Sequence, residues 1–85
     1  MLDTAVRYRL DPQVALRPEP FGALAYHYGS RRLTFLRTTL LAEVVRDLGD
    51  HDSVEDALLV VPVGQRDSYR RALAALEESR FIRAC

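Results

Sequence analysis

The sequence predicts an α+β fold, with a small antiparallel sheet first and three helices after it. Apolar and polar residues alternate with a period of two on both sides of a Gly-Ser pair, which is typical of a β-hairpin. From Thr38 onward, apolar residues instead recur every three or four positions, which is the spacing of one helix face. A chain of 85 residues has room for one modest core, so residues 1–85 are expected to form a single domain.

The N-terminal segment is the least regular part of the chain. Residues 1–12 are polar and mixed, and we expect them to be loosely ordered. Residues 14–17 alternate and predict a short strand. Pro18 and Pro20 follow, and because each fixes φ and removes a hydrogen-bond donor, regular structure should end there.

A hairpin is expected over residues 23–36. Gly29 and Ser30 suit a two-residue type II′ turn, which sets the register by pairing His27 with Arg32. One face then carries large apolar side chains and is expected to pack on the core: Leu24, Tyr26, Tyr28, Leu33 and Phe35. The other face is smaller and more polar, and is expected to be solvated: Ala23, Ala25, His27, Arg32, Thr34 and Leu36.

Three helices are expected after the hairpin. The first is capped by Thr38 or Thr39 and ends at Gly49. The second is short and is capped by Ser53, with Asp56 three residues later. The third covers residues 66–80, and residues 81–83 close the core as an extended segment. Residues 59–65 fit either a helix tail or an extended linker.

The sequence gives little sign of catalysis. His27 and His51 are the only histidines and Cys85 is the only cysteine, so no metal-ligand spacing is present. The glycines are scattered, and no nucleophile motif or phosphate-binding loop occurs. We therefore expect no enzymatic activity, no metal and no cofactor.

The charge and hydropathy of the chain indicate which kinds of partner to expect. Twelve basic residues, all of them arginine, balance twelve acidic residues, so the broad attraction to nucleic acid is missing. No apolar run approaches the roughly 18–20 residues that span a bilayer, and the first residues do not resemble a signal peptide. A cytoplasmic protein without a nucleic-acid or membrane partner is expected.

Two elements could bind a partner. Arg66, Arg70 and Arg71 crowd the start of the third helix; they form either a solvated face or a contact for anions on a peptide or on DNA. The second hairpin arm is β-prone, and if it is the sheet edge it could accept a peptide as an added strand. Alternatively, the N-terminal segment of the chain covers this edge.

A family resemblance favours the peptide. The stretch RPEPFGALAYHYGSRRLTFL, residues 17–36, and the helix after it resemble the peptide chaperones of mycofactocin biosynthesis, within the PqqD-like group of precursor-peptide recognition domains. The resemblance implies a winged-helix-like domain with a three-stranded antiparallel sheet followed by three helices. It further implies that the chain binds the leader of a ribosomally made precursor peptide and presents it to a radical SAM maturase, which itself holds the iron–sulfur clusters.

The same resemblance implies where the leader binds. The leader would add to the third strand, in the cleft between that strand and the last helix. The implied strand residues are Arg31, Arg32, Leu33, Thr34, Phe35 and Leu36, and the implied helix residues are Tyr69, Arg70, Leu73, Ala74 and Glu77. An exposed edge strand could also pair between two copies of the chain, as a homodimer. Because winged helices also bind DNA, a winged helix-turn-helix regulator is the alternative function.

Overall fold

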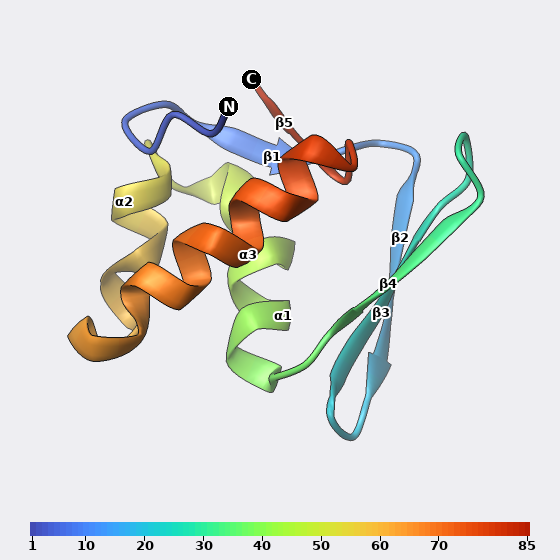
Figure 1. Cartoon of the computed structure of the whole chain (residues 1–85), viewed down its shortest axis with the longest axis horizontal. Coiled ribbons are helices and arrows are strands. Elements are labelled where there is room, and N and C mark those ends of the chain that lie inside the picture. The colour runs from blue at the N-terminus through green and yellow to red at the C-terminus, as the bar shows by residue number, and fades with distance from the viewer.

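The computed structural model describes all 85 residues and has an α+β architecture. A three-stranded antiparallel sheet is followed by three α-helices, which confirms the expected fold class (Figure 1). The strands are β1 (Tyr8–Leu10), β2 (Val14–Glu19), β3 (Gly22–His27), β4 (Arg32–Leu36) and β5 (Ile82–Ala84). The helices are α1 (Thr39–Arg46), α2 (Val54–Ala57) and α3 (Arg66–Glu78), with 3₁₀ turns η1 (Leu48–Asp50), η2 (Leu58–Val60) and η3 (Val63–Gln65).

The hairpin has the predicted register but a different turn. β3 and β4 pair with His27 opposite Arg32 and Ala25 opposite Thr34, as expected. Four residues, 28–31, connect the strands, and the residue in the left-handed conformation is Arg31, with φ 57°. Gly29 does not have a positive φ, so the prediction of a type II′ turn is wrong. The register survives because the four-residue connection closes on His27 and Arg32, which the two-residue turn would also have placed opposite each other.

The assignment of the two sheet faces is wrong. The face of small residues packs on the helices, where Ala23, Ala25 and Leu36 are at most 3% exposed. The face of large residues is open to solvent, and Leu33 and Phe35 are 54% and 53% exposed. Helix α1 lies against β3, and small side chains there allow it to come close (Figure 1).

His27 is likewise part of the core, although it was expected to be solvated. It is 7% exposed, and its ring packs edge-on against Phe81 at a centroid distance of 5.7 Å. The backbone N–H of Ser30 donates to its Nδ1 at 3.1 Å. This hydrogen bond compensates for the burial of a polar ring and ties the hairpin turn to the core.

The two ends of the chain form a second, two-stranded sheet. β1 pairs antiparallel with β5, and Tyr8 is only 4% exposed. The expectation that residues 1–12 are loosely ordered is therefore wrong for β1. The final extended segment does close the core, as predicted, with Phe81 and Ile82 buried.

The boundaries of the other elements differ by small amounts from the prediction. β2 continues through Pro18, which the outer strand of a sheet tolerates because its second side needs no donor. Thr38 caps α1 and Ser53 caps α2 as predicted, but α1 ends at Arg46, before Gly49. Helix α3 ends at Glu78, and residues 59–65 are mostly 3₁₀ turns.

Candidate functional site

One side of β4 is unpaired. The strand order β2-β3-β4 places β4 at the edge of the three-stranded sheet. The N-terminal segment pairs with β5 instead, so it does not cover this edge. Between the two alternatives left by the sequence, the structure has an open edge strand.

The unpaired side presents the main-chain groups of Leu33 and Phe35. The carbonyl oxygen of Leu36 points toward β3, because a Cβ built on Gly22 of β3 would lie only 2.1 Å from it. Successive residues of a strand direct their N–H and C=O groups to opposite sides, so Thr34 also faces β3. The N–H and C=O groups of Leu33 and Phe35 therefore point away from the sheet, where an added strand would pair with them.

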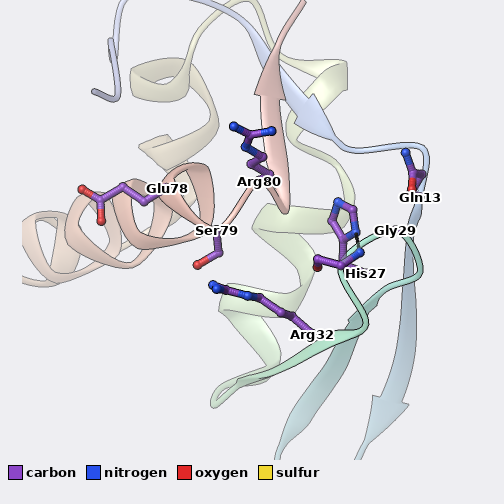
Figure 2. Close-up of a pocket in the computed structure, with 8 residues that line it drawn as sticks. Gln13, His27, Gly29, Arg32, Glu78, Ser79 and Arg80 are labelled. Carbon is purple, nitrogen blue, oxygen red and sulfur yellow. Dashed lines mark hydrogen bonds between the residues drawn. The ribbon is translucent and has the colours of Figure 1, made fainter.

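Helix α3 flanks this edge at both ends of β4. Just after β4, the hydroxyl groups of Thr38 and Tyr69 are 3.1 Å apart and share a hydrogen bond. At the start of β4, Arg32 lines a pocket of about 480 Å³ together with Ser79 and Arg80, which follow α3 (Figure 2). The start of α3 thus lies near the end of β4, and the end of α3 lies near its start.

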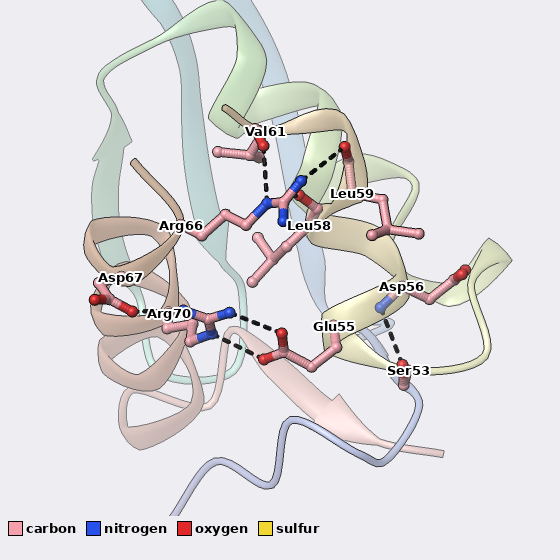
Figure 3. Close-up of polar contacts among 9 residues, drawn as sticks. All are labelled: Ser53, Glu55, Asp56, Leu58, Leu59, Val61, Arg66, Asp67 and Arg70. Atoms are coloured by element: carbon pink, nitrogen blue, oxygen red, sulfur yellow. Dashed lines mark hydrogen bonds and ion pairs between the residues drawn. The ribbon is translucent and has the colours of Figure 1, made fainter. Parts of the chain in front are cut away.

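Most of the helix residues implied by the resemblance do not face β4. Arg70 donates to both carboxylate oxygens of Glu55 in α2, at 2.7 and 2.8 Å, and also contacts Asp67 (Figure 3). Glu77 accepts a hydrogen bond from the hydroxyl of Tyr8 at 3.0 Å. Ala74 lies between Arg70 and Glu77 on the same flank of the helix. This flank faces α2 and the N-terminal segment.

Two other implied residues belong to the core. Leu73 is fully buried, so it offers no surface to a ligand. Tyr69 is 8% exposed, and its hydroxyl alone reaches the edge strand through Thr38. Of the implied helix residues, Tyr69 is therefore the one that the structure brings together with β4.

The flank of α3 that leads to Ser79 was not predicted from the sequence. Ser79 lines the pocket with Arg32, and Ala72 and Ala75 precede Ser79 by seven and four positions, so they share its flank. All three side chains are small. Their spacing at helical intervals, beside the core positions, was the sequence signal that could have predicted this flank. Small side chains leave room beside β4, as an added strand would require.

The arginines at the start of α3 have structural contacts. The guanidinium of Arg66 donates to the carbonyl oxygens of Leu58, Leu59 and Val61, and so fixes the chain between α2 and α3 (Figure 3). The hydrogen bonds from Arg70 hold the pKa of Glu55 below its ordinary value of 4.5, against the effect of desolvation. These two arginines are therefore occupied, which weakens the interpretation of α3 as a DNA-recognition helix.

The structure has neither a cluster of potential metal ligands nor a helix that could span a membrane. No three His, Cys, Asp or Glu side chains gather in an arrangement that could hold a metal ion. None of the helices combines the length and the apolar character required to span a bilayer.

Comparison with known proteins identifies the family. Residues 7–83 match the model of the peptide chaperone MftB family. The chain is 45% identical over 82 residues to the peptide chaperone MftB of Mycolicibacterium smegmatis, which covers 94% of this chain and 80% of the relative. It is 43% identical over 77 residues to the peptide chaperone MftB of Mycobacterium tuberculosis, covering 88% of this chain and 71% of the relative. No solved structure matches. The extent of these matches confirms the resemblance to the mycofactocin chaperones, and the chain belongs to the peptide chaperone MftB family.

Proposed function

We propose that this chain binds the leader of a ribosomally made precursor peptide along the free edge of β4 and presents it to a radical SAM maturase in mycofactocin biosynthesis. The single observation that carries the binding mode is the unpaired side of β4, with the main-chain groups of Leu33 and Phe35 directed outward. The names of the relatives support the peptide as ligand. The chain would act in the cytoplasm, without catalysis and without a cofactor of its own.

Strand addition explains how a small surface could bind a peptide. Each main-chain hydrogen bond contributes only about 0.5–1.5 kcal/mol net, so side-chain contacts have to supply the rest of the affinity. Alternate side chains of an added strand would lie beside Leu33 and Phe35 on the outer face of the sheet. The others would point toward the small-residue flank of α3 that includes Ala75 and Ser79.

Leu33→Pro and Leu33→Ala form a matched pair that tests the edge. Both variants lose the leucine side chain, but only the proline also loses the outward N–H. An outer strand tolerates proline on its unpaired side, so the fold should survive in both. In a titration with the synthetic leader, Leu33→Pro should bind about tenfold more weakly than Leu33→Ala. Equal affinities, with both folds intact by circular dichroism, would contradict binding at this edge.

Thr34→Pro is a poorer probe of the edge. Because Thr34 faces β3, a proline there would remove a donor from the hairpin itself and lower the stability of the whole domain. Its loss of binding would then follow from unfolding and would not identify the edge.

The presenting role has its own test. The precursor peptide is incubated with the reduced maturase and S-adenosylmethionine, with and without this chain, and its mass is followed. We expect modification to be faster with both proteins present, since tethering raises the effective concentration of peptide. This chain without the maturase should leave the mass unchanged. Equal modification with and without the chain would contradict the presenting role.

Other occupants of the edge can be separated by controls. A second copy could pair through β4, and the leader would then dissociate the homodimer in size-exclusion chromatography. Duplex DNA at physiological salt is the control for the regulator alternative. A DNA complex without leader binding would overturn the proposed function.

A further inference from the structure

The pocket between the hairpin turn and the end of α3 has an unusual lining. None of its eight lining residues is hydrophobic: Gln13, His27, Gly29, Ser30, Arg32, Glu78, Ser79 and Arg80. Figure 2 shows Arg32 extending from β4 toward Ser79, with Arg80 on the other side of Ser79. The pocket lies at the first residue of β4, which is where a strand added to the edge would begin or end.

The pocket is rich in unpaired hydrogen-bond donors. Arg32 and Arg80 form no ion pair in the structure, whereas Arg70 and Arg46 both do. Glu78 is the one acidic residue in the lining, and its carboxylate is turned away from both arginines (Figure 2). Since Nδ1 of His27 accepts the N–H of Ser30, the proton of the neutral ring is on Nε2, which makes that atom another donor.

Two strained backbone positions lie in or directly beside this pocket. The chain has two non-glycine residues with positive φ, Arg31 at 57° and Arg80 at 64°. Arg31 directly precedes Arg32, and Arg80 lines the pocket. Arg80 occupies the position after α3 where glycine is usual: its N–H donates to the carbonyl of Glu77, and the N–H of Phe81 donates to that of Leu76. Strained residues gather at sites where the side chain has a use that outweighs the strain.

We propose that this pocket is a subsite for a carboxylate of the bound peptide, held by Arg32 and Arg80. Guanidinium groups match the planar geometry of a carboxylate, and the serines and His27 add further donors. The inference rests on the proposed function and adds the chemistry of the ligand: an acidic residue at the end of the added strand. The ligand is thus a peptide with an anionic group at a fixed distance from its paired segment.

Four variants test this subsite against the same synthetic leader. Arg32→Gln and Arg80→Gly each remove one guanidinium, and the double variant removes both. Arg9→Gln is the matched control, because Arg9 is exposed on β1 and does not line the pocket. Arg80→Gly also relieves the left-handed strain, so its melting temperature should rise while its affinity falls. A higher melting temperature together with a lower affinity would show that binding is lost while the fold is kept.

The titrations should give a graded result. Each single pocket variant should bind the leader about three- to tenfold more weakly than the wild type, and the double variant more weakly still. Arg9→Gln should stay within about twofold of the wild type. The wild-type titration tests the proposed function itself, so a leader that does not bind at all overturns both proposals. A leader that binds the double variant as tightly as it binds Arg9→Gln overturns only the subsite.

Altered leaders identify the carboxylate. Each Asp or Glu of the leader is replaced in turn by its amide, and every peptide carries a C-terminal amide, because in the precursor the end of the leader is joined to the following segment by a peptide bond. One of these changes should weaken binding to the wild type but not to the double variant, because the double variant has already lost the two guanidinium groups that the carboxylate would contact. The position of that change tells which carboxylate enters the pocket and in which direction the leader runs along β4. If none of the changes weakens wild-type binding, the subsite is wrong.

Discussion

The two faces of the β2-β3-β4 sheet differ in size as well as in burial. The inner face carries Ala23, Ala25 and Leu36, and the helices cover it. The outer face carries larger side chains, among them Leu33 and Phe35, which are more than half exposed. The face with the larger apolar side chains is therefore not the core face. The core face is the one against which the helix packs closely. Large exposed apolar residues beside an open strand are typical of an interaction surface.

The largest expected effect comes from two adjacent residues on opposite faces. Leu36→Ala should lower the free energy of unfolding by about 2–4 kcal/mol, because Leu36 is 1% exposed and its removal leaves a cavity. Phe35→Ala removes a larger side chain but should cost less than about 1 kcal/mol, because Phe35 is 53% exposed. Urea denaturation of both variants checks this. A loss for Phe35→Ala that equals the loss for Leu36→Ala would mean that both faces are buried in solution.

A smaller effect is expected from enlarging an alanine on either face. Ala25→Leu should destabilise the domain by about 1–3 kcal/mol, since it has to fit between β3 and the helices. Ala15→Leu is the matched control: Ala15 pairs with Tyr26 on the outer face, where a longer side chain has room. The thermal midpoints of the two variants make the comparison. A stable Ala25→Leu protein would contradict close packing of the inner face.

The smallest expected effect concerns charge and not burial. The pKa of Glu55 is lowered by Arg70, so this pair stabilises the folded state above the ordinary pKa of 4.5. That stability is lost as the pH falls through the lower, folded-state pKa of Glu55. Glu55→Gln should therefore cost little near pH 7, because the pair is partly exposed, and should flatten the loss of stability below about pH 4.5. Urea unfolding of the wild type and of Glu55→Gln from pH 7 to pH 3 measures this effect. If the free energy of unfolding falls as steeply with pH in the variant as in the wild type, the prediction is contradicted.

Local features of the sequence predicted much of the fold. The hairpin register, a cap at Thr38 or Thr39, the cap at Ser53 and a start of α3 near Arg66 were predicted, because each depends on residues that are neighbours in the chain. The β1–β5 pairing was missed because it joins the two ends of the chain, and three-residue strands leave almost no periodic signal.

The candidate site was predicted on its strand side and less well on its helix side. The second hairpin arm was predicted as a sheet edge that could accept a strand, with cover by the N-terminal segment as the alternative, and the structure leaves its outer side unpaired. The family resemblance implied that Arg70 and Glu77 line the cleft. Their partners, Glu55 and Tyr8, lie far away in the sequence, so no local pattern could have assigned them to the other flank.

The central claim is that a leader peptide pairs with the outward groups of β4, and amide hydrogen exchange measured by NMR tests it most directly. In the free protein, the amide of Thr34 should exchange slowly, because it faces β3, while the amides of Leu33 and Phe35 exchange quickly. Saturating leader should slow exchange at Leu33 and Phe35 by about tenfold or more and change Thr34 little. A leader that binds while both outward amides still exchange as in the free protein would contradict strand addition at this edge.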